Sequence, residues 1–270
     1  MALLSFSEMS TYRWTFDEDV HALEAAGIPA IHIWRRKLSD FGEEKAIHLL
    51  EEVGMQVSAL SWIGGFTGSD GSSYQESLAD AKKTIHLAAE MKAACLVIYS
   101  GSRGGHTQNH SRKLFESALI ELLPYAEEYN LPLAIEPMHV NCGGDWTFYH
   151  SLESTLQLID QFKHPLLRFV ADLYQLGHDH AVVDQLVQHV DKIALVQVAD
   201  ATAAPEEEQN RCLLGEGVLP IRETILALNQ AGYRGYYDIE LLGADVEHFK
   251  YQHLIEHSQK FFDQVLATSV

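Results

Sequence analysis

The sequence predicts a single (β/α)₈ barrel, in which eight parallel strands alternate with helices. Short apolar runs rich in β-branched residues recur along the chain, and each precedes a turn and then a segment with a hydrophobic period near 3.6 residues. Runs such as residues 95–99 are hydrophobic almost throughout, which is typical of parallel strands covered on both faces. The length of 270 residues fits one large barrel, so we expect one domain over 1–270.

The expected strands follow one another at intervals that leave room for a helix. In chain order they are residues 3–7, 30–34, 56–61, 95–100, 131–136, 167–172, 193–199 and 236–241. Amphipathic segments predict helices at 43–53, 74–91, 112–129, 152–162 and 221–231, and a C-terminal helix at about 245–266. An open doubly wound sheet is the rival fold, but it needs a glycine-rich turn after its first strand, and residues 5–10 contain no glycine.

Composition excludes several classes of partner. The 19 lysines and arginines face 38 aspartates and glutamates, a net charge of −19, so we expect neither nucleic acid nor membrane as a partner. Cys95, Cys142 and Cys212 are widely spaced, which indicates reduced thiols. The chain shows neither a signal-peptide pattern nor an apolar run of ~20 residues, so we expect a cytoplasmic protein. The oligomeric state stays open, and a homo-oligomer is compatible with the sequence.

Oxygen-bearing side chains end the last four predicted strands, where the active sites of such barrels lie. These residues are Glu136, Asp172, Gln197 and Glu240. A single carboxylate at a strand end is more often a helix cap or an ion-pair partner, but three together repel one another unless a cation neutralises them. We therefore expect one divalent metal ion held by these four side chains. Oxygen ligands favour Mn²⁺ or Mg²⁺, with Zn²⁺ or Co²⁺ as alternatives. One negative charge remains, and we expect a nearby cation or a catalytic proton to balance it.

The motifs around these residues resemble a known family. They are Ile-Glu-Pro-Met at 135–138, Ala-Asp-Leu-Tyr at 171–174, Val-Gln-Val-Ala-Asp at 196–200, Asn-Arg-Cys-Leu-Leu-Gly-Glu-Gly at 210–217 and Ile-Glu at 239–240. They are similar to motifs of the xylose-isomerase-like superfamily of sugar phosphate isomerases and epimerases, which also includes dehydratases and endonuclease IV. The resemblance implies a (β/α)₈ barrel with one divalent metal at the four positions above.

The sequence departs from the pattern of this superfamily at three positions. Gln197 stands where most members have a metal-binding histidine. Gln175 stands where a substrate-contacting histidine is common, and that histidine is either missing or supplied by His178. Cys142 stands where ketose 3-epimerases have a second glutamate, which argues against a true ketose epimerase.

The resemblance implies isomerase or epimerase chemistry on a small polyhydroxy carbonyl substrate, phosphorylated or not. Glu136 and Glu240 would flank the reacting carbons, so that one removes a proton beside the carbonyl and the other returns it. The metal would stabilise the enediolate formed between these steps. Loss of a β-hydroxyl from the same enediolate would give the alternative function, a dehydratase of the inosose or 3-dehydroshikimate type. A DNA nuclease would need histidine ligands and a basic face, and a sugar-binding module gives no reason for three carboxylates around a cation.

Other polar and aromatic residues that follow strand ends are candidates for the pocket. His106 and His139 are candidates for further proton transfer. Candidate substrate contacts are Trp34, Arg35, Trp62, Gln175, His178 and Arg211. A planar guanidinium suits an anionic group, so Arg211 is expected to clamp the substrate, with a solvent-exposed loop arginine as the alternative. The two tryptophans either stack on a sugar ring or pack at the barrel top. Asp200 is expected to orient a ligand or a water molecule.

Overall fold

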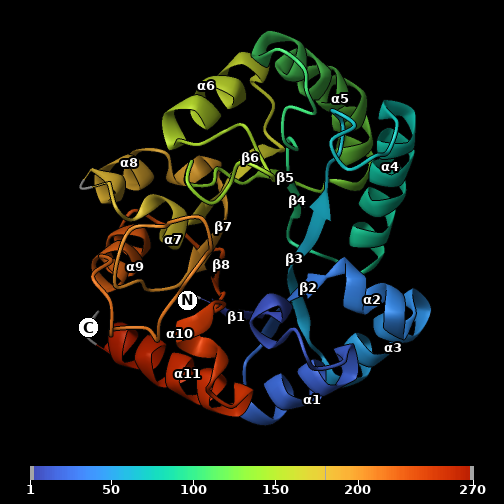
Figure 1. Cartoon of the computed structure of the whole chain (residues 1–270). Coiled ribbons are helices and arrows are strands. Elements are labelled where there is room, and N and C mark those ends of the chain that lie inside the picture. The colour runs from blue at the N-terminus through green and yellow to red at the C-terminus, as the bar shows by residue number, and fades with distance from the viewer. Residues whose placement is uncertain (1–2, 180, 268–270) are drawn as a thin grey trace.

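Eight parallel strands form a closed barrel in the computed structural model, which describes residues 3–179 and 181–267 (Figure 1). The strands follow their chain order around the barrel, and β8 pairs with β1 to close it. They are β1 (Leu3–Ser7), β2 (Ala30–Trp34), β3 (Gln56–Ile63), β4 (Leu96–Ile98), β5 (Leu133–Ile135), β6 (Leu167–Asp172), β7 (Ile193–Val198) and β8 (Tyr236–Ile239). The predicted (β/α)₈ barrel is confirmed.

Helices form a ring around these strands, and α11 lies beside α1 (Figure 1). They are α1 (Phe16–Ala26), α2 (Arg35–Phe41), α3 (Glu43–Val53), α4 (Tyr74–Glu90), α5 (Gln108–Tyr129), α6 (Leu152–Phe162), α7 (Leu173–Leu176), α8 (Val182–Gln188), α9 (Ile221–Gln230), α10 (Ala244–Glu247) and α11 (Tyr251–Ala267), with short 3₁₀ helices η1 (Glu8–Thr11) and η2 (Val190–Lys192). Local sequence sets the start of α4, because Ser73 and Glu76 satisfy each other's backbone N–H groups in a capping box. None of the helices in the described ranges is long and apolar enough to cross a membrane.

Every predicted strand end lies within two residues of the observed one, but the C-terminal helix expected at 245–266 is wrong in one respect. The chain leaves the helix at residues 248–250, so this segment forms two helices, α10 and α11. Contacts to distant segments hold α10: Asn210 Oδ1 accepts a hydrogen bond of 2.9 Å from the Asp245 amide, and the Glu247 carboxylate accepts one of 2.8 Å from Tyr12. Residues 244–251 contain neither proline nor glycine, so the local sequence does not mark the break.

Buried apolar side chains form two clusters. The larger cluster packs the strands against the surrounding helices. The smaller cluster comes from the strands and fills the barrel interior with Ala59, Cys95, Val97, Ala134, Val170 and Leu195. Strand side chains alternate between faces. A residue two positions after a member of the smaller cluster therefore also faces the barrel interior, one layer nearer the carboxyl ends of the strands. On four consecutive strands those residues are Tyr99, Glu136, Asp172 and Gln197.

Candidate functional site

The upper interior layer brings the four predicted metal ligands to one site. Asp172 pairs in register with Gln197 across β6 and β7, and Gln197 pairs with Asp238 across β7 and β8. Glu240 lies two residues beyond Asp238, and Glu136 directly follows β5. All four side chains are buried, with exposed fractions between 0% at Asp172 and 9% at Glu240.

Arg211 connects two of these carboxylates. Its Nη2 atom lies 2.9 Å from Asp172 Oδ2 and 3.0 Å from Glu240 Oε1, and the side chain is 1% exposed. Burial lowers the pKa of Arg211, but the charges of Asp172 and Glu240 outweigh this effect and raise it, so the guanidinium stays charged. Arg211 is thus a buried residue of the site itself and not an exposed loop arginine. It places a positive charge beside two of the three carboxylates.

Glu136 and Glu240 have different hydrogen-bond partners. Glu136 Oε2 accepts a bond of 2.7 Å from the Tyr99 hydroxyl. Glu240 Oε2 accepts bonds of 2.8 Å from Gln197 Nε2 and 3.3 Å from Ser7 Oγ. Burial raises the pKa of Glu136, and the charges of Glu240 and Asp172 raise it further. The pKa of Glu240 is also raised by burial, although Arg211 opposes the effect. Both carboxyl groups therefore bind a proton more readily than a carboxyl group in water.

The donor set and the charge of the site fit a divalent ion. Three carboxylates and one guanidinium carry a formal charge of −2, which one divalent ion would neutralise. The Gln197 Oε1 atom is buried and makes no hydrogen bond to any described residue. An orphaned buried acceptor is costly, and coordination to a cation would satisfy it. The ligand atoms would all be oxygens, the donors that hard cations prefer.

A buried chain of hydrogen bonds lies in the layer below Glu240. His32 Nδ1 is 2.6 Å from Asp238 Oδ2, and His32 Nε2 is 2.6 Å from Ser61 Oγ. Burial lowers the pKa of His32, but Asp238 and the charge of Glu240 outweigh it and raise the pKa above its ordinary value. Donor atoms of His32, Asp238 and Glu240 lie within 4.8 Å of one another, which would suit a metal. Both histidine nitrogens are already engaged at short distances, however, so we interpret this group as a hydrogen-bonded chain.

Sequence reasoning missed this chain. Asp238 has the same inward orientation as Glu240 on β8, so its position was visible from strand alternation. Its partner was not, because His32 lies on β2 and the two residues are 206 positions apart.

Three of the predicted substrate contacts, Trp62, Arg35 and Trp34, make different interactions at the rim of the barrel. The Trp62 ring packs 5.6 Å from that of Tyr99 and 5.0 Å from that of Trp146, so it lies beside the residue that binds Glu136. The guanidinium of Arg35 binds Asp80 at 2.7 and 2.9 Å and the backbone carbonyl of Trp62 at 3.0 Å. The backbone amide of Trp34 donates a hydrogen bond to Glu8, and the guanidinium of Arg36 lies over the Trp34 ring.

The predicted histidines lie apart from the carboxylates. His139 and His178 line a pocket of about 390 Å³ together with His150 and Gln175, and its lining includes none of the four predicted metal ligands. His106 lies 3.2 Å from the Thr67 carbonyl oxygen. The proton-transfer roles expected of His106 and His139 and the substrate contact expected of His178 stay predictions.

Gln175 belongs to a different network. It accepts a bond of 2.8 Å from the His139 amide and donates one of 3.2 Å to Gln209 Oε1. The same Gln209 oxygen accepts a bond of 2.6 Å from Arg211 Nη1. Gln175 is thus one residue removed from Arg211, and it ties the loop after β5 to the loop after β7.

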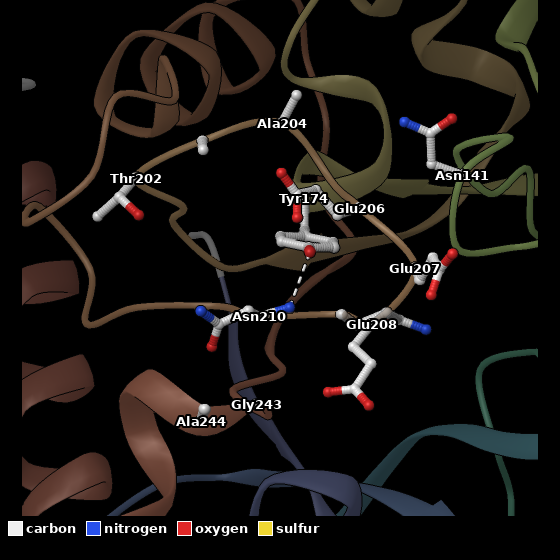
Figure 2. A pocket seen from close by; sticks show the side chains of 12 residues that line it. Asn141, Tyr174, Thr202, Ala204, Glu206, Glu207, Glu208, Asn210, Gly243 and Ala244 are labelled. Carbon is white, nitrogen blue, oxygen red and sulfur yellow. Dashed lines mark hydrogen bonds between the residues drawn. The ribbon is translucent and has the colours of Figure 1, made fainter.

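A cavity of about 880 Å³ adjoins the site beneath the 201–210 loop, which follows β7 (Figure 2). Tyr174 lines the cavity, and its hydroxyl accepts a hydrogen bond of 2.8 Å from the Asn210 amide. The Arg211 guanidinium lies 4.4 Å from the centre of the Tyr174 ring, which places the cavity next to the carboxylates. Asn141 Nδ2 donates a bond of 3.0 Å to the Pro205 carbonyl oxygen and so joins two loops across this mouth.

Asp200 fixes the backbone on both sides of the 201–210 loop. Its carboxylate accepts hydrogen bonds of 2.9–3.1 Å from four backbone amides, those of Ala201, Gly215, Gly217 and Leu219. A Cβ atom at Gly217 would lie 2.1 Å from Asp200 Oδ1, so only glycine fits there. Asp200 also pairs with Cys212 through a short antiparallel bridge. Its carboxylate therefore holds the loop in place, and its expected role in orienting a ligand or a water molecule stays a prediction.

The fold and this site together define a (β/α)₈ barrel with a buried cluster of acid–base groups at the carboxyl ends of its strands. The model of the xylose isomerase-like TIM barrel family matches residues 20–265, so the chain belongs to this family. No curated protein sequence matches the chain significantly.

Solved structures share the fold at low sequence identity. Protein SMc04130 from Sinorhizobium meliloti 1021 is 24% identical with a TM-score of 0.82, covering 98% of this chain and 95% of its own. The IolI protein with a binding zinc atom is 19% identical with a TM-score of 0.81, covering 99% of both chains. L-ribulose 3-epimerase is 15% identical with a TM-score of 0.81, covering 100% of this chain and 96% of its own.

Proposed function

We propose that this protein is a divalent-metal-dependent isomerase or epimerase that moves a proton next to the carbonyl group of a small polyhydroxy substrate. The observation that carries the proposal is the arrangement of Glu136 and Glu240, which directly follow β5 and β8, the first and last of the four strands that carry the proposed ligands, and whose pKa values are both raised by burial. A raised pKa makes a carboxylate a stronger base and keeps a protonated carboxyl group available to return the proton. Relatives of this fold that are named as epimerases support the same chemistry.

Different residues of the chain have separate roles in this reaction. One glutamate removes the proton beside the carbonyl, and the other returns a proton on the same or the adjacent carbon. Tyr99 holds the Glu136 carboxyl group, while Gln197 and Ser7 hold Glu240. Fixed partners keep both carboxyl groups in the geometry needed for transfer, which reduces the entropic part of the barrier.

Glu136, Asp172, Gln197 and Glu240 would hold the metal ion, and Mn²⁺ or Mg²⁺ suits this oxygen set best. A bound divalent ion supplies Lewis acidity that polarises a carbonyl oxygen. The zinc of the IolI structure supports a divalent ion in a barrel of this fold. The cavity of about 880 Å³ beside the site has the size of known small-molecule pockets.

Exchange of carbon-bound hydrogen tests the proposal. The metal-depleted protein is incubated in D₂O with keto- and aldo-sugars and inososes, with and without Mn²⁺, and deuterium incorporation is followed by NMR. We expect metal-dependent exchange on at least one substrate, lost in Glu136→Gln and retained in Glu223→Gln, which alters an exposed carboxylate on α9. Loss of water with a new conjugated absorbance would assign a dehydratase instead. The absence of exchange and of water loss with every substrate would contradict the proposal.

A further inference from the structure

Arg211 forms ion pairs with carboxylate oxygens that a metal ion would use. Its Nη2 atom is 2.9 Å from Asp172 Oδ2 and 3.0 Å from Glu240 Oε1, so one nitrogen bridges two of the proposed ligands. We propose that Arg211 is an internal cation that competes with the divalent ion for Asp172 and Glu240, so that binding of the ion releases the guanidinium. This inference rests on the proposed function, because it uses the same set of ligands.

All four oxygens of the two carboxylates are already engaged, three by hydrogen bonds and Glu240 Oε1 by its ion pair with Arg211. Asp172 Oδ1 accepts one of 2.8 Å from the Tyr174 amide, and Glu240 Oε2 accepts those of Gln197 and Ser7. The two remaining oxygens are those that face Arg211. An ion at these carboxylates must share an oxygen with a donor or displace one. Arg211 is the only one of these donors that carries a full positive charge, so its contact is the one that the ion disfavours most.

Burial makes this competition strong. Arg211 and Asp172 are 1% and 0% exposed, so water screens the repulsion between guanidinium and ion poorly. The formal charge of the cluster is −2 with Arg211 and would be −3 without it. Removal of the guanidinium should therefore strengthen metal binding and, in the absence of metal, destabilise the fold by leaving buried carboxylates unpaired. These effects have opposite signs, whereas a merely structural arginine would produce only the second.

The contacts of Arg211 connect this exchange to the cavity mouth. Its backbone amide is fixed by a bond of 2.9 Å to the Leu242 carbonyl oxygen, so a response to the ion must come from the side chain. Nη1 donates to Gln209 Oε1 at 2.6 Å, and Gln209 belongs to the 201–210 loop that lines the cavity. Displacement of the guanidinium would therefore break or move an anchor of this loop.

Calorimetric titration with Mn²⁺ tests the competition. The metal-depleted wild-type protein is compared with Arg211→Met and with Arg168→Met, whose guanidinium binds the Pro165 carbonyl oxygen near the start of β6. We expect Arg211→Met to bind Mn²⁺ roughly ten-fold or more tightly than wild type, within the usual range of coupling between sites. Without metal, Arg211→Met should have a lower melting temperature than wild type. Mn²⁺ should raise the melting temperature of this variant by more than it raises that of wild type. Arg168→Met should keep the wild-type affinity.

A second measurement needs no variant at this position. Endoproteinase Glu-C cleaves after glutamate, and Glu206, Glu207 and Glu208 are exposed in the 201–210 loop. Saturating Mn²⁺ should accelerate cleavage there in wild type, because the anchor through Gln209 is released. An unchanged rate would contradict the release of Arg211.

Failure of the inference differs from failure of the proposed function. If Asp172→Ala abolishes Mn²⁺ binding while Arg211→Met leaves the affinity equal to or weaker than wild type, the ligand set stands and the competition is wrong. If Asp172→Ala binds Mn²⁺ as wild type does, the ligand set is wrong, and both proposals fall with it.

Discussion

Tyr99 donates a hydrogen bond of 2.7 Å to Glu136, and the two residues come from neighbouring strands of the barrel interior. Burial raises the pKa of Tyr99 well above its ordinary value, and the charge of Glu136 adds to the effect, so the hydroxyl stays protonated and acts as a donor. This contact fixes one oxygen of Glu136 and leaves Oε1 for other partners.

Replacement of Tyr99 by phenylalanine removes this donor with little change in shape. A hydrogen bond to a charged group contributes about 1.5–3 kcal/mol, so we expect kcat to fall roughly 10- to 100-fold. Mn²⁺ affinity should change less than kcat, because the carboxylate itself remains. Steady-state kinetics on the best substrate of the deuterium screen measure the effect. Tyr149→Phe, a buried tyrosine outside the cluster, is the matched control. Equal losses in both variants would show that Tyr99 acts only through packing.

The two glutamates should be far more sensitive than Tyr99. Glu136→Gln and Glu240→Gln each remove a proton-transfer group, and we expect turnover to fall by ~10³-fold or more. Metal binding should fall less than turnover, because an amide oxygen can still coordinate. Kinetics and calorimetry on the same protein samples separate the two effects. Near-normal turnover of Glu240→Gln would mean that another group moves the proton.

Gln197 distinguishes this chain from the common pattern of its superfamily. A neutral amide does not titrate, so the native site should keep its metal down to the pH at which carboxylates protonate. Gln197→His should shift the preference toward Zn²⁺ or Co²⁺ and make binding weaken below a pH of ~6.5. Metal affinities measured between pH 5 and 8 for both forms provide the comparison. If neither the preference nor the pH profile changes, Gln197 is not a ligand.

The barrel, and the position of the four proposed ligands at the ends of its last four strands, were predictable because both depend on local patterns. Each of the last four strands carries an oxygen-bearing residue at its end, and strand alternation places these residues on one face. The partners of these residues were not predictable, because they depend on contacts between distant segments. Arg211 could be assigned to a loop from the sequence, but not to Asp172 and Glu240. In the same way, the hydrogen bond between the His139 amide and Gln175 could not be predicted, because the two residues are 36 positions apart.

A second buried cluster should make stability depend on pH. Glu8 accepts a hydrogen bond of 2.7 Å from the Trp34 amide and lies beside Asp19, which Lys37 binds. Burial raises the pKa of Glu8 well above its ordinary value of 4.5, and the charge of Asp19 raises it further. The stability that this group contributes is therefore full below pH 4.5 and is lost as the pH rises through its value in the folded protein.

Glu8→Gln tests this dependence, because glutamine has the shape of a protonated glutamate and does not titrate. We expect the variant and wild type to have similar stability near pH 4. At neutral pH the variant should be more stable, with a difference that grows as the pH rises. Urea unfolding at several pH values measures it, and Glu44→Gln on the exposed start of α3 is the control. A difference that does not vary with pH would show that folding does not raise the pKa of Glu8.

The ends of the 201–210 loop are held side by side, independently of what lies between them. Cys212 donates a backbone hydrogen bond of 2.9 Å to the Asp200 carbonyl oxygen, and the Asp200 carboxylate fixes the residues that follow. The entropic cost of closing a loop grows only slowly with its length, so the segment between these anchors can be lengthened or exchanged at small cost. The strands that carry the carboxylates lie outside this segment, although Gln209 at its end binds Arg211. Under the proposed function, exchange of residues 202–208 would change the lining of the cavity and with it the substrate preference, while Glu136 and Glu240 stay in place.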